Sequence, residues 1–207
     1  METNGKSLQI APDTLGDNHH ICAFFHSMDE QYRVLHSFMT DGFDQGEKAF
    51  HLVDPKRRDE HLRRLADGGL DVEAAIGSGH LEVHPWQDGP LRGDRFDQET
   101  WLAGFEDVLR SAPAGGYAHT RFLGQMEWAL EDLPDVSDLI EFESRVNYVV
   151  PKYDDTTVIC AYDLSKFGAT TVINALRTHP LVIVGGLIHE NPFYVEPAQF
   201  LREATVH

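Results

Sequence analysis

Three histidines and one of the two cysteines of the chain fall within eight residues, His19 to His26. In a strand, alternate side chains share a face, so His20 and Cys22 would point the same way. An imidazole and a thiol on one face can ligate a metal, or act as base and nucleophile. The second cysteine, Cys160, is remote in sequence, and neither cysteine belongs to a CxxC pair. The two thiols meet only if their strands are neighbours, so a metal site, a nucleophile and a buried structural strand all stay open.

Glu143 and Asn147 form a second candidate pair. They lie one turn apart within the apolar stripe of a predicted helix over 137–150. A buried carboxylate destabilises a fold unless it is paired. Glu143 is therefore either part of a structural network, with Arg121 or Arg145, or the polar anchor of a ligand cavity.

Other polar residues follow predicted strands. Glu127 comes just after one, where α/β folds place ligand contacts, although a surface carboxylate at a helix start fits equally well. Asp163 ends another strand and is either a site residue or a cap. His179 and His189 flank a late apolar run and can bind a ligand there, but turn histidines are more often solvated.

The elements that must position these residues alternate along the chain from residue 19 onward. The predicted strands cover 21–25, 48–53, 80–84, 117–124, 156–162, 181–188 and 193–195, and the later helices cover 137–150, 165–177 and 197–204. Strands that alternate with helices predict a three-layer α/β fold, with a mostly parallel sheet covered on both faces. We expect residues 1–18 to be a flexible N-terminal arm and residues 19–207 to form a single domain.

The turn after the first predicted strand is where a nucleotide-binding fold carries its glycine-rich phosphate loop. Here it reads His26-Ser-Met-Asp-Glu30, with no glycine, no lysine and two carboxylates. Neither a P-loop pattern nor GxGxxG occurs anywhere in the sequence. Ser27 and Glu30 instead have the spacing of a helix capping box. The sequence therefore disfavours a nucleotide-phosphate cradle at this turn.

The charge balance bears on partners and location. The chain has 34 acidic against 17 basic residues, a net charge of −17. Such a field repels phosphate backbones and anionic lipid, so we expect no direct nucleic-acid or membrane binding. The start has no signal-peptide core, and no apolar run approaches the ~20 residues of a membrane span. These features predict a cytoplasmic protein with reduced thiols.

An ordered series of short motifs gives the chain a family resemblance. The series is His20-Ile-Cys22, Phe50-His-Leu-Val-Asp54, Gly124-Gln-Met-Glu-Trp-Ala129, Glu143-Ser-Arg-Val-Asn147, Cys160-Ala-Tyr-Asp163, His179-Pro180 and Glu190-Asn-Pro-Phe193. Over about residues 19–203 it resembles the MEDS domain, a sensory domain named for methanogens, methylotrophs and a dichloromethane-responsive regulator. The resemblance implies a RecA/KaiC-like fold without a phosphate loop. It also implies a small-molecule sensor, proposed for simple hydrocarbon derivatives.

The resemblance further suggests ligand contacts and partners. The residues that match the polar motif positions, and so are hypothetical ligand contacts, are His20, Cys22, Glu127, Glu143, Asn147 and Cys160. Family members are usually attached to DNA-binding or kinase modules, and we find none in this sequence. We therefore expect a stand-alone sensor that signals through a histidine kinase, an anti-sigma factor or a transcription regulator. A homo-oligomer is left open.

Two other functions stay open. One is a metal- or haem-linked redox sensor that uses His20, Cys22 and Cys160 with a distant histidine; otherwise we expect no cofactor. The other, ranked lowest, is an enzyme with Glu127 or Glu143 as general base. A general base needs a positioned partner, and the sequence shows none at a diagnostic spacing. The leading expectation is therefore a sensor and not an enzyme.

Overall fold

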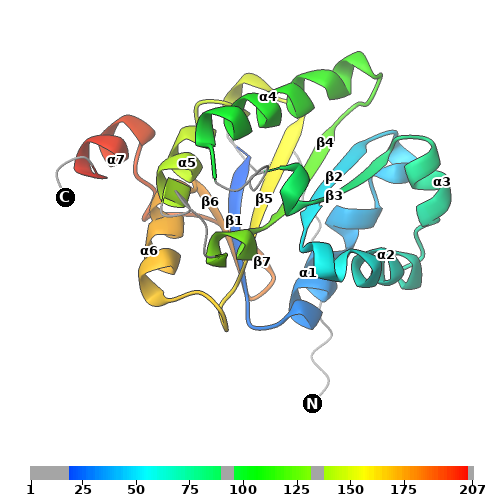
Figure 1. The fold of residues 1–207 in the computed structure, drawn as a ribbon, viewed down its shortest axis with the longest axis horizontal. Helices are drawn as coiled ribbons and strands as arrows, with labels where there is room; N and C mark the ends of the chain where they lie inside the picture. The colour runs from blue at the N-terminus through cyan, green and yellow to red at the C-terminus, as the bar shows by residue number, and fades with distance from the viewer. Residues whose placement is uncertain (1–18, 90–95, 132–137, 205–207) are drawn as a thin grey trace.

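A seven-stranded sheet forms the middle of the computed structural model, which describes residues 19–89, 96–131 and 138–204 (Figure 1). The strands are β1 (His20–Phe25), β2 (Lys48–Val53), β3 (Leu81–Pro85), β4 (Thr120–Gln125), β5 (Thr156–Asp163), β6 (Leu181–Val184) and β7 (Leu187–Glu190). They lie in the order β3-β2-β4-β5-β1-β6-β7, and every neighbouring pair is parallel except β6 and β7. The predicted mostly parallel α/β sheet is confirmed.

Helices cover both faces of this sheet (Figure 1). The helices on one face are α1 (Met28–Thr40), α2 (Arg58–Asp67) and α3 (Val72–Gly77), and those on the other are α4 (Gln98–Ala114), α5 (Leu139–Val146) and α6 (Ala169–Thr178). Helix α7 (Pro197–Ala204) packs beside α5 and α6. All six residues of β1 and all eight of β5 are buried, as expected for central strands covered on both faces. The three-layer prediction is confirmed.

Alternation along β1 divides its side chains between two hydrophobic cores. Ile21 and Phe25 pack with α1, α2 and α3, whereas Cys22 and Phe24 pack with α4, α5 and α6. Strands β1 and β5 are neighbours, and Cys22 lies directly opposite Cys160. The two cysteines therefore lie on neighbouring strands, which is the condition for their side chains to come close.

The turn between β1 and α1 has the structure of a cap and not of a phosphate loop. Ser27 Oγ accepts a hydrogen bond from the Glu30 backbone N–H at 3.2 Å. The Glu30 carboxylate accepts one from the His26 N–H at 2.7 Å. Backbone N–H groups at a helix N-terminus can bind a phosphate. Here one such N–H group donates to a carboxylate of the protein itself.

Three predicted elements differ from the structure at the C-terminal end. The run 181–188 is two antiparallel strands, because Gly185 and Gly186 have φ values of 60° and 80° and turn the chain back. Residues 193–195 form no strand. Helix α6 begins at residue 169 and not at 165, since Asp163 accepts from the Ser165 N–H and hydroxyl and fixes a turn there.

Helix α5 is shorter than the predicted 137–150, because regular α-helix ends at Val146. The predicted arm, residues 1–18, lies outside the described residues, and the assignment of 19–207 to one domain stays a prediction. Within the described ranges, no helix has both the length and the apolar character needed to cross a membrane.

Candidate functional site

Four side chains that can ligate a metal meet beneath α5, on the sheet face that α4, α5 and α6 cover. They are His20, Glu143, Cys160 and His179, and we call them the acid–histidine cluster. One ligand atom from each lies within 4.8 Å of those of the others. None of the four is more than 6% exposed. Such a concentration of polar atoms inside a hydrophobic core is costly unless each atom is satisfied.

Four separate elements supply the cluster. His20 opens β1, and Cys160 lies near the middle of the adjacent β5. Glu143 projects from the buried stripe of α5, between Phe142 and Val146. His179 follows α6 directly and leads into β6. Parallel strands and their crossover helices thus bring together residues up to 159 positions apart.

Hydrogen bonds around the cluster fix the tautomers of both histidines. His179 Nδ1 lies 2.7 Å from the backbone oxygen of Ala175, which only accepts, so this nitrogen carries the proton. Asn147 Nδ2 donates to backbone oxygens of Glu143, Ser144 and Thr178. Its Oδ1 therefore accepts from His20 Nδ1 at 3.2 Å. In the neutral form of either ring, Nε2 then carries a lone pair.

Both Nε2 atoms face the same carboxylate oxygen. Glu143 Oε2 lies 3.0 Å from His179 Nε2 and 3.3 Å from His20 Nε2. The Cys160 thiol is 3.5 Å from His20 Nε2. Among the described residues, no hydrogen-bond partner of good geometry reaches either oxygen of Glu143 or the Nε2 of His179. An unsatisfied buried group costs about 1–3 kcal/mol, and more when it is charged.

Burial and the neighbouring groups set the charges in the cluster. Burial, reinforced by His179, lowers the pKa of His20 to about 4. Burial opposes ionisation of Glu143, but the adjacent His179 and His20 rings lower its pKa to about 2. Burial, followed by the Glu143 charge, raises the pKa of the Cys160 thiol well above its ordinary value. At neutral pH the cluster therefore holds an ionised carboxylate, a neutral His20 ring and a protonated thiol.

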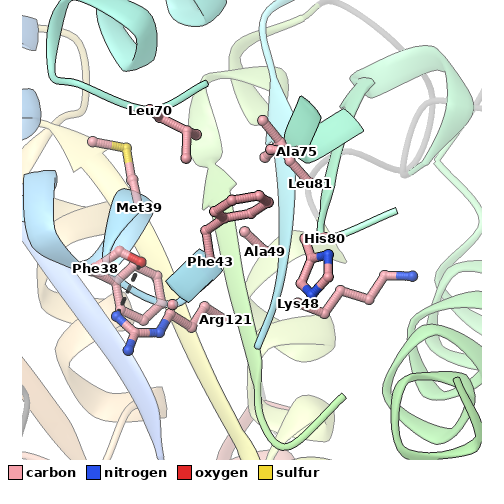
Figure 2. A pocket seen from close by; sticks show the side chains of 11 residues that line it. Phe38, Met39, Phe43, Lys48, Ala49, Leu70, Ala75, His80, Leu81 and Arg121 are labelled. Carbon is pink, nitrogen blue, oxygen red and sulfur yellow. Dashed lines mark hydrogen bonds between the residues drawn. The ribbon is translucent and has the colours of Figure 1, made fainter. Parts of the chain in front are cut away.

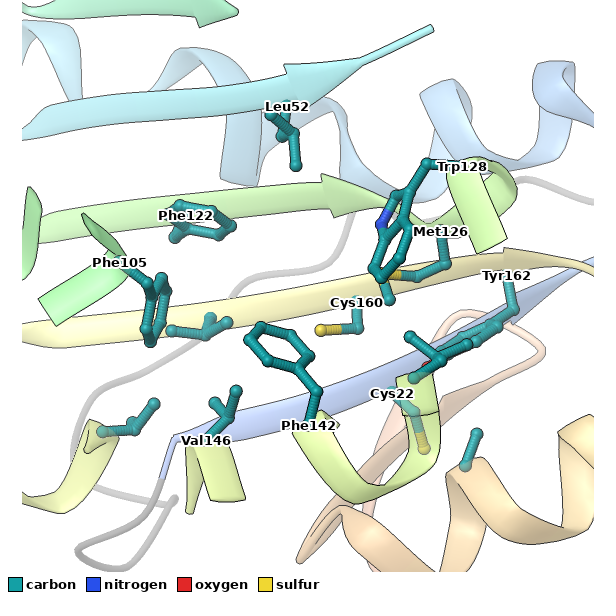
Figure 3. Packing of buried hydrophobic residues seen from close by; sticks show 14 of the residues in the cluster. Cys22, Leu52, Phe105, Phe122, Met126, Trp128, Phe142, Val146, Cys160 and Tyr162 are labelled. Atoms are coloured by element: carbon teal, nitrogen blue, oxygen red, sulfur yellow. The ribbon is translucent and has the colours of Figure 1, made fainter. Parts of the chain in front are cut away.

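An apolar cavity of about 20 Å³ adjoins the cluster. Its polar end is formed by His20, Glu143 and Cys160. The rest of its wall is apolar and is formed by Leu52, Trp101, Phe105, Phe122, Gly124, Met126, Trp128, Phe142, Val146 and Val158. Figure 3 shows Phe142 of α5 pointing toward Cys160 of β5, with Phe122 and Trp128 nearby. The space holds about one water-sized molecule.

A second cavity, of about 10 Å³, lies on the opposite face of the sheet, around Phe43 (Figure 2). Arg121 lines it, pairs with Glu47 and donates to the backbone oxygens of Ser37 and Phe38. Lys48 also lines it and pairs with Glu82. Both charged groups of this cavity are thus partnered, so it is the weaker candidate. Arg145 pairs with Glu99. The predicted pairing of Glu143 with Arg121 or Arg145 is wrong, since histidines surround that carboxylate instead.

Of the six predicted ligand contacts, the structure brings His20, Glu143, Asn147 and Cys160 together. Cys22 lies opposite Cys160, but its thiol donates to the Leu181 backbone oxygen at 3.6 Å. Cys22 does not line the cavity.

Glu127 lies in a short 3₁₀ helix after β4 and is mostly buried. Its carboxylate pairs with Lys166 Nζ at 3.3 Å. Lys166 also lies 3.8 Å from Asp163. Glu127 is not among the residues that line the cavity, although both of its chain neighbours are. The position after a strand was therefore a poor guide to which side chain enters the site.

His179 is the cluster member that sequence reasoning undervalued. Turn histidines are more often solvated, but the His179 side chain is fully buried. The sequence signals are its place between a helix and an apolar strand and the His179-Pro180 motif. A second buried group was missed altogether: Tyr32 Oη lies 2.6 Å from His61 Nδ1, and His61 Nε2 lies 2.9 Å from His51 Nδ1. We call these three residues the histidine–tyrosine chain.

The fold and the site define a three-layer α/β domain that has a mostly parallel sheet, a capped first β–α turn without a phosphate loop and a polar cluster buried on one sheet face. Comparison with known families identifies it further. The chain belongs to the MEDS family, the methanogen/methylotroph, DcmR sensory domain, whose family model matches residues 19–180. This is a sensory-domain family and not a known enzyme family.

Two known proteins illustrate the relationship. The chain is 23% identical over 176 residues to the transcriptional repressor DcmR of Methylorubrum extorquens. That match covers 85% of this chain but only 63% of the repressor. The crystal structure of a KaiC-like protein from Pyrococcus horikoshii OT3 superposes with a TM-score of 0.56 at 13% identity, over 80% of this chain and 69% of the other. At that identity the similarity concerns the fold alone, and it confirms the expected KaiC-like architecture.

Proposed function

We propose that the chain is a sensory domain that binds a small, largely apolar molecule in the cavity beside the acid–histidine cluster. The observation that carries this proposal is the make-up of the cavity wall, which combines buried aromatic rings with a few convergent polar groups. Small-molecule sites in proteins have this character, because apolar walls supply affinity and the polar groups fix orientation. Simple hydrocarbon derivatives fit such a wall.

The small size of the cavity suggests how binding produces a signal. A molecule larger than water enters only if Phe142 of α5 or Trp101 of α4 moves away from the sheet. The ligand then binds this opened state better than the closed one and shifts the population toward it. Helix α5 packs against α6 and α7, so its movement reaches elements at the surface. A partner that contacts this side of the molecule would detect the change.

The output we propose is regulation of transcription. Support comes from the membership of a sensory-domain family and from the similarity to a protein named as a transcriptional repressor. The charge of −17 argues against contact between this chain and DNA. The domain would therefore act through a signalling protein, such as a histidine kinase, an anti-sigma factor or a transcription regulator.

Filling the cavity tests the proposed ligand site. A Cβ added at Gly124 would meet Met126 Sδ at 3.6 Å and Phe122 at 3.7 Å, which are ordinary contacts. Gly124→Ala should therefore fold and occupy part of the cavity. Gly104→Ala on α4 is the matched control, since nothing lies within 4 Å of its added Cβ.

The experiment measures melting temperature and tryptophan fluorescence against a panel of dichloromethane, short alcohols and methylated amines. We expect at least one compound to raise the melting temperature of the wild type and of Gly104→Ala. Gly124→Ala should bind that compound about tenfold more weakly or worse, which corresponds to about 1.4 kcal/mol. The proposal fails if no compound has an effect, or if Gly124→Ala responds as the wild type does.

A further inference from the structure

We propose that the acid–histidine cluster is a binding site for one divalent transition-metal ion of the zinc type. The ligand atoms would be His20 Nε2, His179 Nε2, one Glu143 oxygen and Cys160 Sγ. This inference goes beyond the proposed function and does not depend on it, because the ion needs no occupant in the apolar cavity.

The distances between the ligand atoms carry the geometric part of the inference. In a tetrahedral zinc site with bonds of about 2.0–2.3 Å, neighbouring ligand atoms are about 3.3–3.8 Å apart. Glu143 Oε2 is 3.0 Å from His179 Nε2 and 3.3 Å from His20 Nε2. His20 Nε2 is 3.5 Å from Cys160 Sγ, and all four atoms lie within 4.8 Å of one another. Shifts of a few tenths of an ångström to about one ångström would complete the shell.

The surrounding hydrogen bonds match those of metal-binding histidines. Such histidines donate the N–H that does not face the metal to a carbonyl, carboxylate or water, which orients the ring and leaves a lone pair for the ion. His179 Nδ1 donates to Ala175 and His20 Nδ1 donates to Asn147. Both Glu143 oxygens and His179 Nε2 lack a hydrogen-bond partner of good geometry among the described residues, and a cation placed between them would satisfy these atoms.

Charge balance favours a divalent ion with these four ligands. When it binds, the Cys160 S–H bond breaks, a sulfur–metal bond forms and the proton goes to solvent. One thiolate and one carboxylate then neutralise the two positive charges, while both imidazoles stay neutral. The buried site carries no net charge. Two imidazoles, a thiolate and a carboxylate suit zinc better than the oxygen-seeking magnesium or calcium.

Four protein ligands fill a tetrahedral shell, which is typical of structural and not of catalytic zinc. The ion would therefore join α5 and the α6–β6 connection to β1 and β5. Of these elements, α5, β1 and β5 line the cavity. A metal there would hold the cover of the cavity against the sheet.

Cobalt(II) is the probe for the test, because a thiolate bound to it gives a charge-transfer band and tetrahedral coordination gives intense visible bands. Since the cluster is buried, tag-free protein is unfolded with a chelator and refolded with cobalt(II), then with zinc(II) as competitor. Cys160→Ala and Cys22→Ala are matched variants, since both cysteines are buried and occupy opposite register positions on β1 and β5. Circular dichroism checks that each variant folds.

We expect wild type and Cys22→Ala to bind one cobalt ion per chain with the thiolate band, and zinc to displace it. Cys160→Ala should lose that band, and Glu143→Gln should bind about 100-fold more weakly or worse. The inference is overturned if refolded wild type holds no stoichiometric metal, or if Cys160→Ala keeps the thiolate band. The cluster would then be an ion pair between Glu143 and a protonated His179. That result would leave the Gly124→Ala test of the ligand cavity unaffected.

Discussion

The acid–histidine cluster and the histidine–tyrosine chain each bury two imidazole rings, on opposite faces of the same sheet. In the chain, His61 lies between Tyr32 and His51, with contacts of 2.6 and 2.9 Å. Each contact needs one proton, so neutral rings can make both contacts. His61 is then satisfied at both nitrogens, whereas His51 Nε2 lacks a partner among the described residues. In the cluster, by contrast, both Glu143 oxygens and His179 Nε2 lack a hydrogen-bond partner of good geometry among the described residues.

The difference between these groups separates a structural network from a candidate site. Burial lowers the pKa of His61 to about 4 and also lowers that of His51. Both rings of the histidine–tyrosine chain are therefore neutral at neutral pH. The cluster contains an ionised Glu143, and the described residues offer it no hydrogen bond of good geometry. A buried charged group that the fold leaves unsatisfied requires an explanation, and a functional site or a bound ion is one. The following predictions test this contrast, from the largest expected effect to the smallest.

Metal should stabilise the protein through the cluster alone. At a free zinc concentration about 1,000 times the dissociation constant, binding raises the free energy of unfolding by about 4 kcal/mol. For a domain of this size that corresponds to an increase in melting temperature of about 8–16 °C. Differential scanning calorimetry with zinc or with chelator measures it. His61→Leu should retain the increase, whereas Glu143→Gln should keep at most about a third of it. The reverse pattern would place the metal at the histidine–tyrosine chain and not at the cluster.

Breaking the histidine–tyrosine chain should destabilise the fold with or without metal. His61→Leu removes the partner of both Tyr32 and His51 and leaves polar atoms unsatisfied, at a cost of about 3 kcal/mol. Urea unfolding of this variant, of Tyr32→Phe and of the double variant measures the coupling between Tyr32 and His61. Effects that add without coupling would show that the 2.6 Å contact contributes little.

Acid should destabilise the folded protein through the histidine–tyrosine chain. Burial, followed by the charge of Arg58, lowers the pKa of His61 to about 4, below the ordinary value near 6.5. Between these values the unfolded chain binds more protons, so stability falls as the pH falls. From about pH 7.5 to about pH 5 this histidine should cost about 2 kcal/mol. The cost of His61→Leu should therefore shrink to about 1 kcal/mol at about pH 5, and a constant cost across this range would refute the buried neutral chain.

The sequence predicted the fold more completely than it predicted the residues of the candidate site. Continuous apolar strands and amphipathic helices specify layers by local pattern, so the parallel sheet and its two covered faces were predictable. The glycines at 185 and 186 form a turn. Because apolar residues surround them, the whole run was predicted as one strand. Period and composition do not distinguish one strand of eight residues from a hairpin of two short strands.

The site depends on contacts between distant parts of the chain, which local pattern does not specify. Glu143 was recognised because a carboxylate within an apolar stripe is anomalous, but its partners were assigned to arginines. Opposite charges suggested that choice, yet Arg121 and Arg145 satisfy other acids near the surface. His179 carried no local sign of burial. Its role follows only from the order of the strands, which brings β6 next to β1.

Glu143→Gln gives the most discriminating comparison when the protein is metal-free. The glutamine amide has nearly the shape of the carboxylate, carries no charge and can donate to the Nε2 lone pair of His179 or His20. One hydrogen bond of good geometry in place of an unsatisfied carboxylate should raise the free energy of unfolding by about 1 kcal/mol in urea with chelator present. Loss of stability by a similar amount would mean that a protonated His179 already satisfies Glu143. A gain in stability together with loss of metal binding would show that Glu143 destabilises the metal-free fold and is needed to bind the ion.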